Sequence, residues 1–184
     1  MPALVAGIHV LIAKEGVDGR DKPGHDTEII VVPSFRTTRR VKHSASEMFD
    51  LVADVDRYPE FVPLCERLIV KRRAEGGEGT QILVADMTVT YGPMRQNFTS
   101  QVTLDRPRLA ILVEYIDGPF SRLENRWRFR PAGAESSEVD FFISYEFRSR
   151  TLGLLMGTVF DRAFRRFSEA FEQRADKIYG VKTA

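Results

Sequence analysis

Five consecutive segments with alternating apolar and polar residues, followed by one long segment with helical spacing, constrain this fold more than any other feature. The alternating segments are 83–91, 97–104, 109–115, 123–130 and 138–148, and turns rich in Gly, Pro and Asp separate them. Alternation of this kind is typical of antiparallel strands with one covered side and one side in water.

The covering element is the segment 151–179, which contains no proline and repeats apolar residues at helical spacing. At 1.5 Å per residue this helix would be about 43 Å long. A sheet with one apolar face and a long amphipathic helix bury their apolar surfaces most simply against each other. The sequence therefore predicts an α+β fold, in which a curved antiparallel sheet of about seven strands wraps around a long C-terminal helix.

Shorter elements precede this core. A strand is predicted over 35–41, and Ser44 and Glu47 have the spacing of a capping box at the start of a helix. The prolines in 58–63 must end that helix, because a proline disfavours helical geometry at the residue before it. A short strand near 68–71 completes the predicted set.

Residues 1–32 differ from the rest, because they are rich in Gly, Asp and Lys and show neither a helical nor a strand period. Such a segment buries too little apolar surface to offset its ordering entropy. We expect a disordered or dispensable N-terminal extension at 1–32, one domain at 33–180 and a tail at 181–184.

Charge and cysteine content exclude several classes of protein. The 27 Lys and Arg nearly balance the 26 Asp and Glu, so bulk charge does not indicate a DNA-binding protein. The single cysteine, Cys65, excludes an intramolecular disulfide and a multi-cysteine metal site. No segment approaches the roughly 18–20 apolar residues of a spanning helix. We expect a cytoplasmic protein, with peripheral contact at the cytoplasmic face of the inner membrane as an open alternative.

The sequence offers little for catalysis. It contains no nucleophile elbow, phosphate-binding loop, dinucleotide fingerprint or zinc-protease motif. We expect His43 to be a solvated residue between the first strand and the first helix, and Cys65 to be a small buried apolar group. We therefore predict no catalytic residue, no metal ligand and no catalytic cofactor.

Some polar residues occupy positions that face the predicted core. They are either satisfied core groups or the few polar contacts that orient a bound ligand. These residues are Arg39, Gln96, Ser100 and Asn125.

A cavity is the main alternative to a filled core. A long sheet coils around a helix that is only about 10 Å across, and such a helix cannot fill the whole concavity. Apolar and aromatic side chains would line the remaining space, as they line small-molecule sites. Periodicity alone leaves the cavity and the filled core both open.

Two groups of arginines stand out. Arg126, Arg128 and Arg130 would form a stripe on the outer face of one strand, and Arg162, Arg165 and Arg166 cluster in the final helix. Each group is either a solvated face with local ion pairs or a docking surface for phosphate of RNA or of lipid headgroups.

Three separated motifs resemble one known family. They are Tyr58-Pro59-Glu60-Phe61-Val62-Pro63-Leu64-Cys65, then Asp117-Gly118-Pro119-Phe120 with Leu123 and Trp127-Arg128-Phe129, and then the strand 139–147 before the long helix. Over about 33–180 the chain is similar to the START-like coenzyme Q-binding proteins of the polyketide cyclase/dehydrase superfamily. That family includes the bacterial ribosome association toxin group.

The resemblance implies a helix-grip fold, a curved sheet that grips the C-terminal helix around an elongated apolar tunnel, and it favours the cavity over the filled core. It implies that Tyr58, Phe61, Pro63 and Cys65 form the mouth of the tunnel. We expect inward-facing apolar side chains to form the walls, with Arg39 and Asn125 as polar ligand contacts. The expected wall residues are Met87, Val89, Phe98, Val102, Ile111, Val113, Trp127, Phe129, Phe141, Ile143, Met156, Val159, Phe160 and Phe164.

The resemblance also implies a function. Mitochondrial members bind ubiquinone and support respiratory electron transport by carrying the lipid rather than transforming it, so we expect ubiquinone as a bound ligand and a transient contact with the inner membrane. The alternative is a toxin-like protein that binds the large ribosomal subunit and blocks subunit association. A polyketide cyclase-type enzyme ranks third, because among the core-facing residues only Arg39 and Asn125 are suited to acid-base work.

Overall fold

A seven-stranded antiparallel sheet and one long helix make up most of the chain that the computed structural model describes, residues 11–12 and 31–181. The strand order is β3-β9-β8-β7-β6-β5-β4. A two-stranded sheet, β1-β2, lies outside it. The elements are β1 (Leu11–Ile12), β2 (Val31–Val32), β3 (Ser34–Val41), α1 (Ala45–Ala53), the 3₁₀ helix η1 (Val55–Glu60), β4 (Cys65–Gly77), β5 (Thr80–Tyr91), β6 (Met94–Asp105), β7 (Ala110–Asp117), β8 (Phe120–Gly133), β9 (Ser136–Phe147) and α2 (Arg150–Tyr179).

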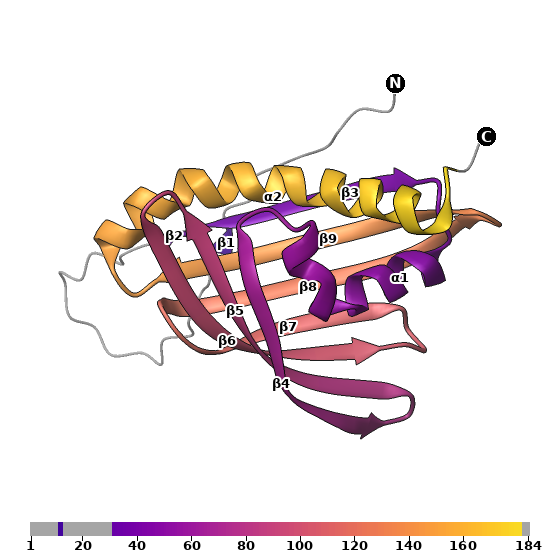
Figure 1. Ribbon diagram of the computed structural model, residues 1–184, viewed down its shortest axis with the longest axis horizontal. Coiled ribbons are helices and arrows are strands. Elements are labelled where there is room, and N and C mark those ends of the chain that lie inside the picture. The colour runs from indigo at the N-terminus through magenta and orange to yellow at the C-terminus, as the bar shows by residue number, and fades with distance from the viewer. Residues whose placement is uncertain (1–10, 13–30, 182–184) are drawn as a thin grey trace, which may run out of the picture.

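The sheet curves around α2. Figure 1 shows β4, β5 and β6 crossing the direction of β3, β8 and β9, while α2 runs along the sheet. The first helix, α1, contacts α2 and the middle strands. This arrangement confirms the predicted α+β helix-grip architecture, with the core between the sheet and the two helices.

Local sequence signals place α1 correctly. The Ser44 hydroxyl accepts a hydrogen bond from the Glu47 backbone N–H at 3.2 Å, and the Glu47 carboxylate accepts one from the Ser44 N–H at 2.8 Å. This reciprocal pair is the predicted capping box. The α-helix ends at Ala53, before the proline segment as predicted, and a 3₁₀ helix that contains Pro59 follows.

Strand β4 is longer than predicted. The sequence indicated a short strand near 68–71, whereas β4 spans Cys65–Gly77. Register shifts occur in its pairing with β5 at three places. Each irregularity resets the alternation of side chains between the two faces, so the period-2 signal is lost although the strand continues.

The expectation for His43 was wrong, because this side chain is fully buried. Its Nε2 lies 2.7 Å from Oδ1 of Asp176 in the last turns of α2. The Ser137 hydroxyl donates to the His43 backbone carbonyl at 2.8 Å. The end of α2 covers the junction between β3 and α1, and a contact so distant in sequence leaves no local pattern.

The boundary predicted at residue 33 stays a prediction. Leu11–Ile12 pair with Val31–Val32 in the small antiparallel sheet. The remaining parts of the predicted extension and tail, residues 1–10, 13–30 and 182–184, lie outside the described residues.

Candidate functional site

A cavity of about 120 Å³ lies between α2 and the concave face of the sheet, so side chains do not fill the core completely. Its lining is almost entirely apolar. An engineered protein cavity of ~150 Å³ admits a benzene molecule, so this cavity has room for about one small ring. In this conformation it is therefore a compact pocket rather than the elongated tunnel that the resemblance implied.

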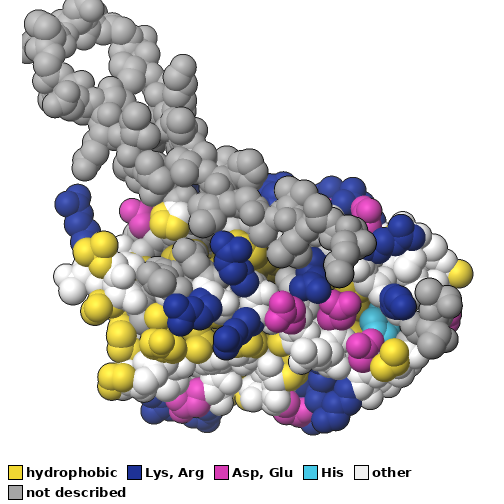
Figure 2. Space-filling view, turned by 90° about the horizontal axis from the view of Figure 1, so that it is seen from above, with side chains coloured by type: hydrophobic (Ala, Val, Ile, Leu, Met, Phe, Trp, Pro, Cys, Tyr) yellow, Lys and Arg dark blue, Asp and Glu magenta, His cyan; other side chains and the backbone are white. Residues whose placement is uncertain are grey.

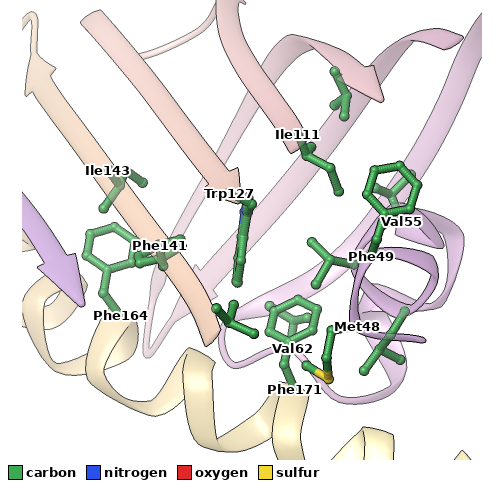
Figure 3. Close-up of a cluster of buried hydrophobic side chains, with 14 of the residues drawn as sticks. Met48, Phe49, Val55, Val62, Ile111, Trp127, Phe141, Ile143, Phe164 and Phe171 are labelled. Carbon is green, nitrogen blue, oxygen red and sulfur yellow. The ribbon is translucent and has the colours of Figure 1, made fainter. Parts of the chain in front are cut away.

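The walls of the cavity consist of alternate residues of the strands and of one face of α2. Alternate residues of neighbouring strands face inward, for example Val113 in β7 and Trp127 in β8. From α2, aromatic rings spaced three and four residues apart project from one face of the helix and include Phe164 and Phe171. In Figure 3, Trp127 extends from the sheet towards Phe171, while Phe141 and Phe164 lie beside each other.

Most of the residues predicted from sequence come together around this cavity. Those that line it are Tyr58, Met87, Val89, Phe98, Val102, Ile111, Val113, Asn125, Trp127, Phe141, Ile143, Phe160 and Phe164.

Three residues of the predicted mouth lie behind the wall. The Phe61 ring packs edge-on against Phe171 with centroids 5.1 Å apart, so it supports the wall without lining it. Pro63 is half-buried in the connection between η1 and β4. Cys65 is buried at the start of β4, and this burial raises the pKa of its thiol to about 11.

Other predicted residues also lie outside the lining. The Phe129 ring packs edge-on against Phe49 of α1 at 6.0 Å. Arg39 forms an ion pair with Glu172 at 2.8 Å. Val159 is half-buried against the core beside the cavity. Met156 belongs to α2, but its side chain lies outside the described ones.

Several lining residues were missed. Phe167 and Phe171 continue the helical spacing of Phe160 and Phe164, so extending that series along α2 would have found them. Ala85 and Leu123 likewise continue rows of inward strand positions. The irregular segment around η1 and β4 gave no such signal. The missed residues are Val55, Val62, Leu68, Ala85, Leu123, Phe167 and Phe171, whereas Ser100 had been identified as a core-facing polar residue.

Asn125 supplies a polar group in the apolar wall. Its Nδ2 donates to the Phe142 carbonyl at 2.9 Å, and its Oδ1 accepts from Nε1 of Trp127 at 2.8 Å. These bonds fix the orientation of the amide. The amide nitrogen carries a second hydrogen. None of the described residues accepts a hydrogen bond from it.

Two hydroxyl groups lie further along the same face. Ser100 lines the cavity and pairs across the strands with Tyr115 of β7. Directly paired residues point to the same side of a sheet, so both face inward. The Tyr115 hydroxyl is buried and has no hydrogen-bond partner among the described residues, which is an unfavourable arrangement for a polar group.

Proton-transfer groups are scarce in this wall. Among the described lining residues the only side chain that ionises in water is Tyr58. Its hydroxyl donates to the Val52 carbonyl at 2.5 Å, and burial raises its pKa well above the ordinary value of 10.0. Within the described ranges there is also no cluster of His, Cys, Asp or Glu suited to a metal ion. The wall can hold an apolar molecule and donate hydrogen bonds to it.

A larger depression, of about 770 Å³, lies on the opposite face of the sheet and is lined by both charged and apolar side chains. Arg126 pairs with Glu124 at 2.5 Å, and Arg130 with Asp140 at 2.9 Å, so the predicted arginine stripe carries local ion pairs. The smaller inner cavity is the better candidate for a ligand site, because it would remove a ligand from water.

Comparison with known proteins gives the same family that the sequence motifs suggested. The family described as "Polyketide cyclase / dehydrase and lipid transport" matches residues 41–172. The ribosome association toxin RatA of Escherichia coli is 30% identical over 153 residues, which cover 83% of this chain and 93% of that protein. The mitochondrial coenzyme Q-binding protein COQ10 homolog B of Xenopus laevis is 32% identical over 141 residues, which cover 74% of this chain and 55% of that protein.

Solved structures agree with this assignment. The 18 kDa protein CC1736 from Caulobacter crescentus is 30% identical with a TM-score of 0.67, covering 80% of this chain and 99% of that one. The Zhui aromatase/cyclase from Streptomyces is 19% identical with a TM-score of 0.65, covering 79% and 94%, a likeness that concerns the fold alone. The chain therefore belongs to the polyketide cyclase/dehydrase and lipid transport family, with relatives among its coenzyme Q-binding and ribosome association toxin proteins.

Proposed function

We propose that this chain binds a prenyl quinone, ubiquinone, in the inner cavity and delivers it without chemical change in support of respiratory electron transport. The apolar wall with its few inward hydrogen-bond donors carries this proposal. A relative named as a coenzyme Q-binding protein provides independent support.

The polar groups of the wall suit a quinone headgroup. The two carbonyl oxygens of a quinone accept hydrogen bonds and donate none. Asn125 and Ser100 line the cavity and supply an N–H and a hydroxyl, and the buried hydroxyl of Tyr115 belongs to the residue that pairs with Ser100, next to the lining. A bound carbonyl would satisfy the buried Tyr115 hydroxyl and so remove the cost of leaving it unpaired.

The isoprenoid tail requires the cavity to enlarge. Burying each CH₂ group contributes about 0.8 kcal/mol relative to water. Because ubiquinone leaves a bilayer that is also apolar, most of that gain cancels on transfer. Exchange with a membrane is therefore thermodynamically feasible in both directions, as a carrier requires.

The chemistry of the wall favours carriage over catalysis. Acid-base catalysis needs a group that exchanges a proton near the working pH. Tyr58 is the single ionisable side chain in the described lining, and its raised pKa keeps it neutral. Solved aromatase/cyclases share the fold, and a cyclase activity would require an acid or base outside this wall.

A matched pair of variants tests the proposal. Val113 faces the cavity and Leu112, its neighbour in β7, faces the outer depression. Val113→Phe fills the cavity and should abolish the prenyl quinone that organic extraction and mass spectrometry recover from the purified protein. Leu112→Phe should retain it. Repeated absence of any prenyl quinone from the unmodified protein would refute the proposal.

Ribosome binding is the second candidate, because relatives of this chain are named ribosome association toxins. Arg162, Arg165 and Arg166 are exposed on α2 and offer a phosphate-binding face. Their joint replacement by glutamate should eliminate a salt-sensitive co-sedimentation with large ribosomal subunits. Replacing the exposed Arg67 and Arg72 of β4 by glutamate is the control. Co-sedimentation that changes neither with salt concentration nor with the α2 or β4 substitutions would exclude this role for α2.

A further inference from the structure

Exposed apolar side chains gather at one end of the molecule. Seven large apolar residues are exposed in the described part of the chain, and four of them are Tyr91, Ile116, Leu154 and Leu155. They come from the end of β5, the end of β7 and the first turns of α2, which Figure 1 places at the same end of the molecule. Leu154 and Leu155 are 83% and 59% exposed. We call these four residues the apolar rim.

The local structure explains why the rim residues are exposed. Tyr91 continues the inward row of Met87 and Val89 beyond the part of β5 that other elements cover. The pairing of β7 with β6 skips Ile116, so this residue sits at a bulge. Leu154 and Leu155 follow closely after Ser149, whose hydroxyl caps α2. The rim is thus a product of three separate segments.

The rim adjoins the cavity. Phe120, between the β7–β8 turn and α2, packs its ring against Phe98 at 5.5 Å and against Phe160 at 6.2 Å. Both partners line the cavity. These rings connect the cavity with the end of β7, where Tyr115 precedes the rim residue Ile116. The Tyr115 ring lies 5.8 Å from Phe120, and its hydroxyl has no partner among the described residues.

Charge is distributed unevenly along α2. The half that begins at the rim, 150–168, contains Arg150, Arg162, Arg165 and Arg166 and one acidic residue. The half 169–179 contains three acidic and two basic residues. Figure 2 shows hydrophobic side chains at the end where α2 begins, with Lys and Arg side chains beside them.

We infer that the apolar rim and the basic half of α2 form a docking face for an anionic lipid bilayer. Exposed leucines and a tyrosine gain by entering the interfacial layer, while the adjacent arginines meet the negative headgroups. Among the described residues, no helix is long and apolar enough to span a membrane. The face deepens the proposed function, since it brings the cavity to the source of a prenyl lipid, and its own argument rests on surface residues alone.

The test is flotation of the full chain with phosphatidylcholine vesicles, with and without phosphatidylglycerol. The Leu154→Ser/Leu155→Ser double variant should lower the partition coefficient by about tenfold per leucine. The control is Ile178→Ser/Val181→Ser, which removes two exposed apolar residues at the other end of α2 and should leave partitioning unchanged. Arg162→Gln/Arg166→Gln should lower binding to the anionic vesicles by about fivefold per arginine and leave binding to neutral vesicles unaltered.

Three results would overturn this inference. The rim double variant could partition as strongly as the unmodified chain, or the control variant could lose as much binding as the rim variant. Alternatively, the unmodified chain could form a dimer that the rim substitutions dissociate, while neither protein binds vesicles. The last result would assign the rim to a second copy of the chain. If the protein contains quinone but does not bind vesicles, the docking face is refuted and the proposed quinone site is not. A protein that binds vesicles but never contains quinone would refute the cavity ligand alone.

Discussion

The two halves of α2 are held to the domain in different ways. In the C-terminal half, polar contacts supplement the aromatic packing of Phe171 against Trp127. Glu172 pairs with Arg39 at 2.8 Å, Asp176 with the buried His43 at 2.7 Å, and Arg174 with Glu60 at 2.6 Å. In the N-terminal half, the contacts with the sheet are aromatic: Phe160 and Phe164 lie within 5.6 Å of the Tyr145 ring.

This difference indicates which part of the helix can move. Hydrogen bonds and ion pairs lose their energy over a small displacement because they are directional. Apolar contacts are not directional, and a bound apolar ligand can replace them. We expect the C-terminal half to act as an anchor and the N-terminal half to shift when the cavity enlarges, which is also the half that begins at the apolar rim.

The largest loss of stability is expected from a substitution in the N-terminal half of α2. Phe164 is 2% exposed and lines the cavity, so Phe164→Ala should lower the free energy of unfolding by about 3–5 kcal/mol, as measured by urea denaturation. The loss arises from lost burial and from an enlarged void. A change below about 1 kcal/mol would show that aromatic packing does not hold this half of α2.

A substitution in the C-terminal half of α2 should cost less stability, and its effect should be local to the last turns of the helix. Asp176→Ala leaves Nε2 of the buried His43 without its partner and should cost about 2 kcal/mol. Hydrogen exchange should accelerate in the last turns of α2 and less at Phe160. Glu172→Ala is the control, since its partner Arg39 is partly exposed and such pairs contribute at most about 1 kcal/mol. Equal costs for the two variants would contradict a distinct role for the His43 contact.

For Tyr115, stability and quinone binding are expected to change in opposite directions. Tyr115→Phe removes a buried hydroxyl that has no partner among the described residues, so the ligand-free protein should gain about 1 kcal/mol in stability. The same variant should bind quinone more weakly, because a donor to the headgroup is lost. A loss of stability would instead show that the hydroxyl is satisfied in the free protein.

A pH dependence is expected from Cys65, the first residue of β4. Burial raises the pKa of the Cys65 thiol from 9.0 to about 11. The folded state therefore favours the neutral thiol. Its contribution is complete below pH 9 and is lost as the pH rises towards 11. The unfolding free energy of the natural chain should decline over this window, and Cys65→Ala should decline less. Identical slopes would contradict the burial of the thiol.

The sequence predicts those parts of the fold that local patterns specify. Ser44 and Glu47 lie three residues apart, so their capping box can be found without knowledge of the rest of the chain. The spacing of Phe160 and Phe164 placed both residues on the cavity face of α2. Regular strands such as β7 and β8 were located from their alternation.

Contacts between distant segments could not be predicted in this way. The buried His43 contacts Asp176, which lies 133 residues further along the chain. Val62 reaches the cavity from an irregular connection, and Leu68 does so from a strand whose bulges erase the alternation. Whether side chains fill the concave face of the sheet depends on their volumes across all these elements. Periodicity therefore could not decide between a cavity and a filled core.

Fluorescence of Trp127 tests the central claim, a quinone held in the inner cavity, most directly. Trp127 is the only tryptophan of the chain and it lines the cavity, so a quinone bound there must approach its ring. Titration with a short-chain ubiquinone should quench the emission to saturation in the natural chain and in Leu112→Phe, but not in Val113→Phe. Quenching that never saturates, or that is identical in all three proteins, would contradict a quinone site in this cavity.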